Sequence, residues 1–292
     1  MLSSWLRAIR IRFLLASIIA VSNGLAITYW KTGTIDPFYA ALTYVGVIFL
    51  HASVDLLNDY WDYKRGIDSV TTRTKFSGGT GVLPENLLAP KAVYAAGVIF
   101  LILGASIGAY FVAVRGITIA VILGFAVVAI YFYSTSIVNA GLGELFVAIK
   151  GAMIVLGTFY VQTPSLEPAA VYVGAIVGIL SATVLFINSF PDFDADRSKG
   201  RRTLVILLGK RTAAAVYPLF IVAVYAMIVV GILFGFTKFY SLISLASLPF
   251  AIRSIVLLRK DHENTDKMVP AMSSTVTYSR ITGFLLAVGL LF

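Results

Sequence analysis

The chain of 292 residues contains no cysteine and only two histidines, His51 and His262. Without thiols, neither disulfides nor thiolate metal sites are available. The two histidines lie far apart in the sequence, and His51 falls inside an apolar run. We therefore expect His51 to be packed or hydrogen-bonded rather than to bind a metal. A metal site in this chain has to be built from oxygen donors.

Charge is also scarce, because only 13% of the residues are charged while 59% are hydrophobic. The mean hydropathy is +0.91, and no soluble domain of this size needs so much apolar surface. The sequence therefore predicts an all-α polytopic membrane protein that forms one domain over residues 1–292. Nine segments approach the length of about 20 residues that crosses a bilayer. They are Phe13–Trp30, Phe38–Leu57, Ala92–Val114, Gly116–Ser134, Leu142–Gln162, Pro168–Phe190, Ala213–Gly235, Phe239–Leu258 and Val276–Phe292. Pro249 is expected to kink the eighth segment.

The net charge of +9 comes from basic residues that fall between the apolar segments. This placement favours membrane topology and anionic substrates or lipids over nucleic acid as the reason for the charge. With a cytoplasmic N-terminus, almost all basic residues outside the segments lie on the cytoplasmic side, and only Lys31, Arg115 and Lys238 lie outside. The sequence therefore predicts a multi-pass protein of the cell membrane with its N-terminus in the cytoplasm and its C-terminus outside.

Two polar stretches share the spacing Asn-x-x-x-Asp. The first covers Asn58–Asp68, and the second covers Asn188–Asp196, where the spacing extends to Asn-x-x-x-Asp-x-x-x-Asp. On a helix, positions i, i+4 and i+8 drift by only about 80° around the axis, so their oxygens lie along one stripe. Pro191 removes a backbone donor within the second stretch, which weakens the helical argument for Asn188.

Carboxylates at a membrane edge are costly unless a cation is present. Oxygen ligands suit a hard ion, Mg²⁺ first, which proteins usually share with a substrate phosphate. One acidic stretch at a helix end is most often a solvated cap, but here two similar stretches both follow apolar segments and both precede basic residues. We therefore expect the two stretches to face each other and to hold Mg²⁺ against a diphosphate. The expected metal ligands are Asn58, Asp59, Asp62, Asp68, Asn188, Asp192 and Asp196, with Asp55 as a further candidate.

Each acidic stretch is followed by a long polar loop. The glycines of residues 69–91 permit backbone shapes that can cradle an anion, although a flexible connector would also use them. The second loop, residues 192–211, is basic. The expected diphosphate-binding residues are Lys64, Arg65, Arg73, Lys75, Arg197, Lys199 and Arg201. The similarity of residues 55–68 to residues 188–202 suggests a weak internal duplication.

On these two motifs the chain resembles the UbiA superfamily of intramembrane prenyltransferases. Further strings, at residues 58–68, 77–84, 141–146, 155–163 and 196–204, resemble the branch that prenylates 1,4-dihydroxy-2-naphthoate in menaquinone biosynthesis. The chain departs from the common pattern in four places. Gly66 stands where the first motif usually has a third Asp, and Asp55 stands where the branch tends to have Asn. Pro191 is unusual inside the second motif, and the segment after Tyr133 lacks a Lys that many members carry.

The resemblance implies nine transmembrane helices around a central cavity that opens to the cytoplasmic side, with Mg²⁺ as cofactor. It implies transfer of an isoprenyl group from an allylic polyprenyl diphosphate to an aromatic acceptor, which in this branch is 1,4-dihydroxy-2-naphthoate. The residues leave open 4-hydroxybenzoate, a glycerol-phosphate lipid or a tetrapyrrole as acceptor, and a cation-coupled transporter as an alternative of another class. The expected partners are the two substrates and membrane lipid, with no nucleic acid and no obligatory protein.

The catalytic candidates are Asp62, Asp192 and Lys150. Lys150 is included because an ionisable side chain within a membrane span is a functional candidate by default, and Arg280 is a second residue of this kind. Aromatic faces stabilise cations, although most aromatic side chains in membrane proteins serve the core or the interfacial belt. The aromatic residues expected at the carbocation and acceptor pocket are Tyr60, Tyr131, Tyr133 and Phe190.

Overall fold

The computed structural model describes residues 1–292 and is entirely helical. Nine of its helical segments are long and apolar enough to cross a membrane, as the sequence predicts. They are α2 (Leu14–Thr32), α3 (Pro37–Lys64), α4 (Pro90–Arg115), α5 (Ile117–Phe132) with the π-helical turn η1 (Tyr133–Ile137), α6 (Gly143–Gln162), α7 (Pro168–Asn188), α10 (Lys210–Leu233), η2 (Phe239–Ser247) with α11 (Leu248–Asp261), and α12 (Thr265–Leu291). Three short helices complete the chain: α1 (Leu2–Ala8), α8 (Phe193–Ser198) and α9 (Leu204–Leu208).

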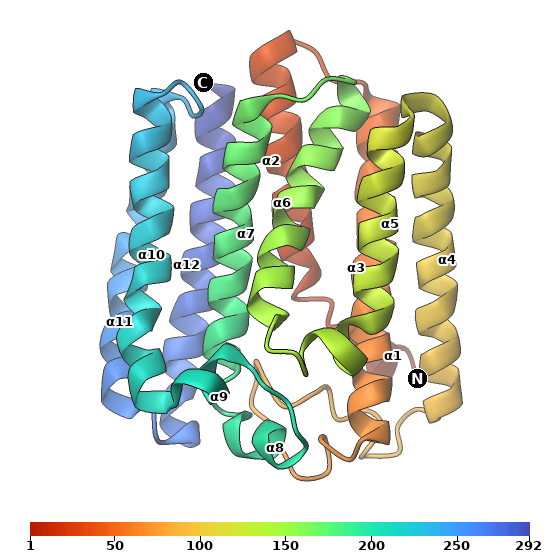
Figure 1. Cartoon of the computed structure of the whole chain (residues 1–292), viewed down its shortest axis with the longest axis vertical. Helices are drawn as coiled ribbons and strands as arrows, with labels where there is room; N and C mark the ends of the chain where they lie inside the picture. The colour runs from red at the N-terminus through yellow and green to blue at the C-terminus, as the bar shows by residue number, and fades with distance from the viewer.

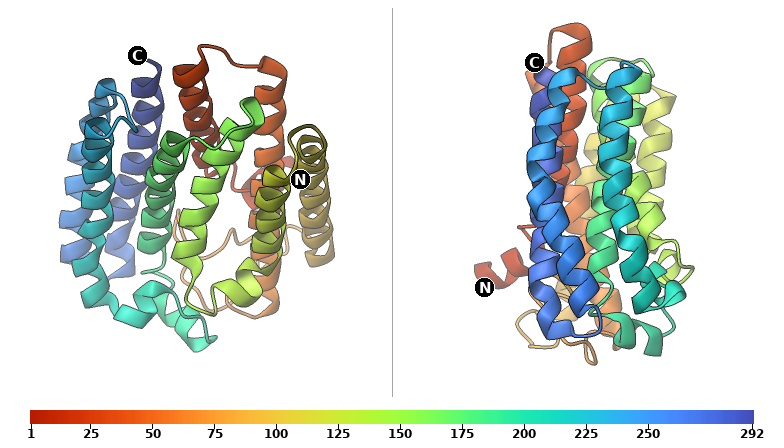
Figure 2. Two further views of the ribbon diagram at one scale, coloured as in Figure 1. Left: turned by 45° about the horizontal axis from the view of Figure 1, so that its top comes forward. Right: turned by 90° about the vertical axis from the view of Figure 1, so that its left-hand side faces the viewer.

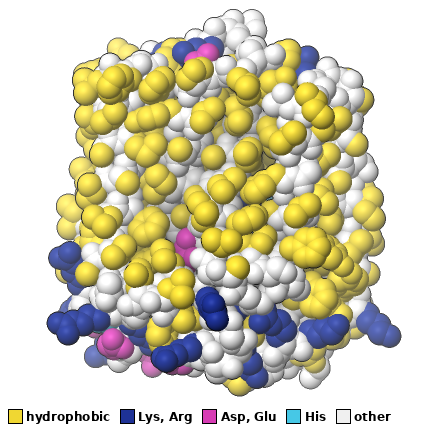
Figure 3. All heavy atoms as spheres, in the orientation of Figure 1, with side chains coloured by type: hydrophobic (Ala, Val, Ile, Leu, Met, Phe, Trp, Pro, Cys, Tyr) yellow, Lys and Arg dark blue, Asp and Glu magenta, His cyan; other side chains and the backbone are white.

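The long helices run side by side, and the functional loops gather at one end of the bundle (Figure 1). The loop that follows α3, together with α8 and α9, lies at the lower end in this view, whereas the C-terminus lies at the upper end. Helix α1 projects sideways from the bundle near the loop end (Figure 2). Apolar side chains cover the middle of the surface, and Lys and Arg side chains gather around the rim at the loop end (Figure 3). This distribution is that of a multi-pass membrane protein.

The helix ends follow from local sequence. Asp36 caps α3 by accepting a hydrogen bond from the backbone N–H of Tyr39 at 3.0 Å, and Pro37 opens the helix. Proline suits this position because its missing N–H would have no partner there. Pro249 does the same for α11, directly after the 3₁₀ segment η2. The expected irregularity of the eighth segment is therefore a change of helix type just before the proline.

Two helices extend further than the hydrophobic pattern predicts. Helix α3 continues to Lys64, so the first acidic motif is helical as far as Asp62. Helix α12 begins at Thr265, where Asn264 accepts a hydrogen bond from the backbone N–H of Lys267 at 3.3 Å. In both cases a polar end of the helix follows from capping and side-chain contacts at the loop end, which hydropathy alone does not register.

Small and hydroxylated residues hold the helices together, as is usual inside membranes. Helices α6 and α7 approach closely at Gly151 and Gly178, where a Cβ on Gly151 would lie 2.8 Å from the Cα of Gly178. In the C-terminal half, the Tyr217 hydroxyl donates to Ser254 at 2.9 Å and contacts Thr275 at 2.6 Å, which joins α10 to α11 and α12. These contacts hold together the bundle that surrounds a cavity lined by α2, α3, α5, α6, α7 and α12.

Candidate active site

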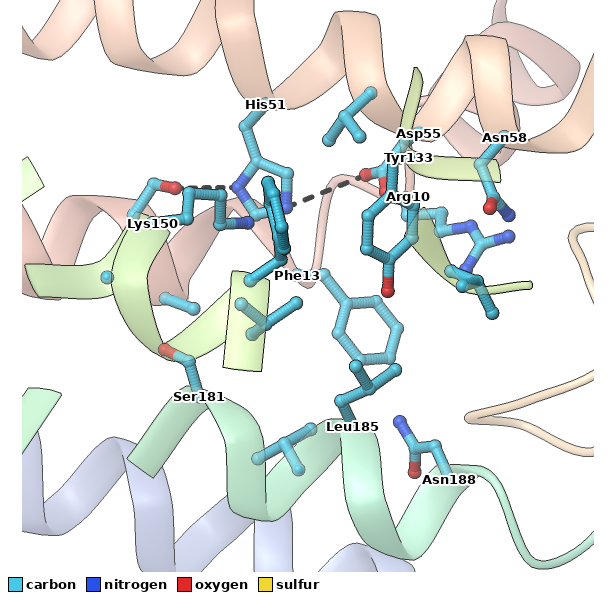
Figure 4. A pocket seen from close by; sticks show the side chains of 18 of the residues that line it. Arg10, Phe13, His51, Asp55, Asn58, Tyr133, Lys150, Ser181, Leu185 and Asn188 are labelled. Atoms are coloured by element: carbon cyan, nitrogen blue, oxygen red, sulfur yellow. Dashed lines mark hydrogen bonds and ion pairs between the residues drawn. The ribbon is translucent and has the colours of Figure 1, made fainter. Parts of the chain in front are cut away.

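A cavity of about 330 Å³ lies between the long helices and reaches the loop end of the bundle. Its lining combines apolar residues of the spans with the polar motifs that the sequence singles out (Figure 4). Asn58, Asp62, Asn188, Asp192 and Asp196 all line it. The expected encounter of the two motifs therefore occurs, although they are more than a hundred residues apart in the chain.

The first motif is a helical stripe, as predicted. Asn58 and Asp62 lie one turn apart on α3, and the Asn58 amide donates to Asp62 Oδ2 at 3.1 Å. The Ser134 hydroxyl of the π-helical turn η1 donates to Asn58 Oδ1 at 2.6 Å. Because both ends of the Asn58 amide are engaged, its orientation is fixed. Ser134 was not among the predicted site residues, since a serine in a turn carries no distinctive signal.

The second motif does not form the single helix that the spacing predicts. Helix α7 ends at Asn188, a turn containing Pro191 follows, and α8 begins only at Phe193. The break places Asp192 just before α8, where it receives a hydrogen bond from the backbone N–H of Gly78 at 3.2 Å. Gly78 has a φ of +83°, which L side chains rarely adopt. The loop of residues 69–89, called here the glycine-rich loop, thus contacts the second motif through its backbone.

Arg201 joins the two motifs. Its guanidinium donates to Asp62 on α3 and, at 3.1 Å, to Asp196 on α8. Its side chain is only 10% exposed. Burial alone would lower the pKa of Arg201, but the two carboxylates hold that pKa above its usual value. The sequence predicts Arg201 as a diphosphate contact, and the structure places it among the acidic side chains themselves.

Two side-chain oxygens of the second motif have no hydrogen-bond partner. Asp192 Oδ1 and Asn188 Oδ1 are buried without a hydrogen bond. Burial, and then the nearby Asp196, raise the pKa of Asp192 to about 7. Burial also raises the pKa of Asp196, although Arg201 opposes the shift. Such oxygens favour a hard divalent cation by donor type. In this arrangement no three acidic side chains converge closely enough to hold an ion, and the Arg201 guanidinium lies between Asp62 and Asp196.

Two predicted metal ligands are engaged elsewhere. Asp59 faces away from the cavity and accepts from Arg10 Nη2 at 2.7 Å and from the Thr80 hydroxyl. Asp68 lies beyond the end of α3, buried against Gly79. Burial, and then the charge of Asp62, raise the pKa of Asp68 to about 8. Both residues hold the loop that follows α3 rather than line the cavity.

The same loop is anchored by a cluster of charges at the surface. Glu85 accepts two hydrogen bonds of 2.8 Å from Arg7 and a further one from Arg73. These hydrogen bonds lower the pKa of Glu85 to about 2. Neither Arg7 nor Arg10 was a predicted site residue, because the positive-inside pattern already accounts for basic residues near the N-terminus. The N-terminal segment is nevertheless what ties the loop down.

The remaining predicted diphosphate contacts do not converge on the cavity. Arg65 donates to the Ser134 carbonyl at 2.9 Å and to Asn139 at 3.0 Å. Lys64 lies over the Trp61 ring at 5.0 Å. The side chains of Arg197 and Lys199 are exposed to solvent. Arg73 and Lys75 line a second cavity of about 740 Å³ beside the first, between the N-terminal segment and the glycine-rich loop.

Among the predicted aromatic residues, only Tyr133 lines the cavity. Phe190 is fully buried and packs edge-on against Phe186. Tyr60 packs on Tyr94, and the Tyr131 and Tyr94 hydroxyls lie 3.4 Å apart on the far side of α3. The aromatic rings that do face the cavity, besides Tyr133, are Phe13, Phe76 and Phe146.

The deeper part of the cavity contains polar side chains from the middle of the spans. His51 is hydrogen-bonded to Ser17 Oγ through Nδ1 at 2.7 Å, which confirms that it is a hydrogen-bonded residue. Its Nε2 lies 3.8 Å from Asp55 Oδ2. Lys150 projects into the same region from α6 (Figure 4). The other intramembrane candidate, Arg280, donates to the backbone carbonyl of Arg12 at 2.5 Å.

The UbiA prenyltransferase family matches residues 17–275. A 1,4-dihydroxy-2-naphthoate octaprenyltransferase of Escherichia coli (strain K12) is 25% identical over 98% of this chain and 94% of its own length. One of the same name from Bacillus subtilis (strain 168) is 26% identical over 84% of this chain and 78% of its own.

Solved structures share the fold. The structure of a UbiA homolog from Archaeoglobus fulgidus bound to DMAPP and Mg²⁺ superimposes with a TM-score of 0.71 at 13% sequence identity, over 99% of both chains. A structure of digeranylgeranylglyceryl phosphate synthase has a TM-score of 0.67 at 18% identity, over 99% of this chain and 98% of that one. The helical arrangement is therefore common to proteins whose sequences differ widely.

Proposed function

This chain belongs to the UbiA prenyltransferase family, and we propose that it transfers an isoprenyl group from an allylic polyprenyl diphosphate to 1,4-dihydroxy-2-naphthoate, with Mg²⁺, in menaquinone biosynthesis. One observation carries the proposal. Asp62 of the first motif and Asp196 of the second converge on the guanidinium of Arg201 at the loop end of the cavity. At this place the carboxylates can balance the charge of a metal ion, and the buried guanidinium can balance that of a diphosphate.

The donor set supports Mg²⁺ at this place. Asn58, Asp62, Asp192 and Asp196 would hold the ion, and the unpartnered oxygen of Asn188 lies beside them. When bound, Mg²⁺ neutralises the charge that builds up on a departing diphosphate. Asp59 and Asp68 support the loop around the ion and are not assigned to it.

The diphosphate would lie against Arg201 and the glycine-rich loop. Arg201 Nε is buried without a hydrogen-bond partner, so the guanidinium keeps a donor for a phosphate oxygen after it has bound the two carboxylates. Gly78 and Gly79 line the cavity with positive φ angles, which turn the backbone toward the site. Arg73 and Lys75 lie at the adjoining opening, where they raise the local concentration of an anionic substrate.

The allylic carbon would react beside Tyr133, Phe13 and Phe76, whose rings line the cavity. Aromatic faces stabilise a carbocation, and their bulk excludes water that would otherwise capture it. The bond between C1 and the diphosphate oxygen breaks, the oxygen keeps the electron pair, and a ring carbon of the acceptor forms the new bond to C1. In the proposed naphthoate reaction the ring carboxylate leaves as CO₂ and its bonding electrons return to the ring.

The choice of acceptor rests on two curated relatives that are named as 1,4-dihydroxy-2-naphthoate octaprenyltransferases. A glycerol-phosphate lipid is the second candidate, because the chain also shares its fold with digeranylgeranylglyceryl phosphate synthase. An acceptor of the 4-hydroxybenzoate type is a third. A transporter is not supported, since the segments that carry the two acidic motifs, the end of α3 and the start of α8, lie at one end of the bundle (Figure 1) rather than near its middle, where transport sites occur.

The topology proposed for the cell places the loop end of the bundle, with α1 and the site, in the cytoplasm and the C-terminus outside. The Lys and Arg side chains that gather at the loop end of the face shown in Figure 3 support this orientation. We also propose that the chain acts as one domain, since the motifs of both halves contribute to one cavity.

Prenyl transfer in lipid nanodiscs tests the function. Radiolabelled geranylgeranyl diphosphate is supplied with and without Mg²⁺, together with 1,4-dihydroxy-2-naphthoate, 4-hydroxybenzoate or a glycerol-phosphate acceptor in parallel. We expect Mg²⁺-dependent product with the naphthoate. Product with another acceptor alone would move the assignment to that acceptor. Absence of both product and diphosphate release in a folded preparation would contradict the proposed reaction.

A further inference from the structure

Lys150 is an unpaired cation in the membrane-spanning part of the cavity. It lies near the middle of α6, in the eighth position of a helix of 20 residues. Its ammonium group makes no hydrogen bond, and no carboxylate oxygen lies within 4.0 Å of it. A lone charge at this depth is costly and usually serves a ligand or a partner. Its side chain lines the cavity, so a ligand in the cavity can supply the missing negative charge.

Three polar side chains on α2 and α3 lie in a row opposite Lys150. Ser17 holds His51 through Nδ1 at 2.7 Å, which leaves Nε2 directed toward Asp55. The separation of 3.8 Å between His51 Nε2 and Asp55 Oδ2 is too long for a hydrogen bond. Asp55 Oδ2 is also buried without any hydrogen-bond partner. Buried polar groups are normally satisfied, so these two atoms mark a place for a hydroxyl of a ligand.

The walls between these groups are apolar and suit a flat ring. Leu50, Val54, Ile130, Phe146 and Ile154 line the cavity around them. His51 precedes Asn58 by seven residues on the same helix, which is about 10 Å along the axis. That is the scale of a two-ring aromatic acid. A ring can therefore lie between the metal motifs at the loop end and Lys150 deeper in the membrane.

We infer that Lys150, His51 and Asp55 form the subsite for the acceptor, with Lys150 binding a ring-borne carboxylate and His51 and Asp55 receiving the adjacent ring hydroxyl. The inference rests on the proposed function and adds the residues that would recognise its acceptor as a hydroxylated aromatic carboxylate. It also removes Asp55 from the metal site, where the sequence left it as a candidate. Loss of the carboxylate as CO₂ removes the charge that Lys150 binds, and this favours release of the product.

Equilibrium binding without any prenyl donor tests the subsite apart from turnover. The full chain in nanodiscs is titrated with 1-hydroxy-2-naphthoate, a carboxylated probe that is not a hydroquinone, and with 1-naphthol, which lacks the carboxylate. Lys150→Met should weaken the binding of the carboxylated probe at least about tenfold, as expected for removing a desolvated charge partner. Binding of 1-naphthol should change less than about twofold, because only its ring and hydroxyl are recognised.

Control variants separate the subsite from a general effect. Lys260→Met makes the same chemical change at an exposed position of α11 and should bind both probes as the native chain does. Lys150→Arg, which keeps the charge, should recover most of the affinity. Asp55→Asn should reduce the preference for 1-hydroxy-2-naphthoate over 2-naphthoate, which has no hydroxyl.

Two results would overturn the inference. One is unchanged binding of the carboxylated probe by Lys150→Met. The other is an equal loss of affinity for both probes, which would indicate a change in cavity shape. Failure of the proposed function looks different, since carboxylate binding that depends on Lys150 would persist in a protein that transfers no prenyl group to naphthoates. If transfer occurs, the same variant should raise the KM for the acceptor and leave the KM for the prenyl diphosphate unchanged.

Discussion

Arg201 binds Asp62, which lies 139 positions earlier in the chain, and so fastens the second acidic motif to the first. The same guanidinium reaches Asp196 at 3.1 Å. Two motifs that follow separate transmembrane helices thereby form one site, and Arg201 neutralises part of its negative charge before any substrate is present. A metal–diphosphate complex that enters the site has to share or replace these contacts.

Removing Arg201 should therefore strengthen the binding of a divalent cation when no diphosphate is present. Arg201→Gln leaves Asp62 and Asp196 without their countercharge, and we expect the affinity for Mn²⁺, a spectroscopic substitute for Mg²⁺, to rise about tenfold. Electron paramagnetic resonance of the nanodisc-bound protein measures this directly. Arg202→Gln, a change at the neighbouring exposed arginine, serves as the control. Equal Mn²⁺ affinity in the native chain and Arg201→Gln would mean that Arg201 does not compete for the site.

The loop over the site should remain anchored in mild acid. The pKa of Glu85 is lowered to about 2 by hydrogen bonds from Arg7 and Arg73. Because the folded-state pKa is depressed, the anchoring contribution is complete above the ordinary pKa of 4.5 and is lost as the pH falls toward 2. Hydrogen exchange of residues 69–89, corrected for intrinsic rates, should show the same protection at pH 5 and pH 7.

The charge-neutral variant provides the contrast. Glu85→Gln should lower the hydrogen-exchange protection of the same loop at both pH values, because an amide cannot replace the ionic contacts to the two arginines. Glu263→Gln, a change at an exposed glutamate whose only ionic contact is with His262, should leave the loop protected. Protection that is already lost at pH 5 in the native chain would contradict this account of the anchor.

The contact between α6 and α7 should not tolerate even a methyl group. Gly178 faces the backbone carbonyl of Ala148, and an added Cβ would overlap it. Gly178→Ala is expected to cost about 1–3 kcal/mol of unfolding free energy through overpacking. Gly124→Ala is the matched control, because a Cβ there meets no atom within 4 Å, and alanine favours a helix by up to about 1 kcal/mol. In thermal unfolding measured in detergent, the Tm of Gly178→Ala should be lower than that of the native chain, and the Tm of Gly124→Ala should not. A Gly178→Ala variant with the native Tm would contradict the close approach of the two helices.

Much of this architecture follows from the sequence. The nine spans are legible because burial in lipid demands long apolar segments, and the two acidic motifs stand out because charge is otherwise scarce near such segments. What the pattern misjudges is geometry that depends on the tertiary structure. Pro191 ends α7 before Asp192, so the second stripe is a turn between two helices. The spacing of the acidic residues alone cannot distinguish a turn from a helix.

The supporting residues could not be predicted from the sequence for a different reason. Arg10 lies in a basic N-terminal segment, and nothing local indicates that it will bind Asp59. Ser134 orients Asn58 only because a π-helical turn brings it across from another span. Conversely, Arg65 and Lys64 follow the first motif closely but contact backbone and aromatic groups instead of the cavity. Proximity in the chain is a weak guide to which face of a helix a side chain occupies.

The central claim is that the two motifs form one metal–diphosphate site, and a double-mutant cycle on diphosphate binding tests it most directly. Mg²⁺-dependent binding of a non-hydrolysable geranylgeranyl diphosphonate is measured for the native chain, Asp62→Asn, Asp192→Asn and the double variant. Asp194→Asn is the control, because the side chain of Asp194 is 86% exposed. If the motifs share the metal, each single change should weaken binding at least about a hundredfold, and the double variant should be hardly weaker than either. Losses that multiply in the double variant, or native affinity in either single variant, would contradict a shared site.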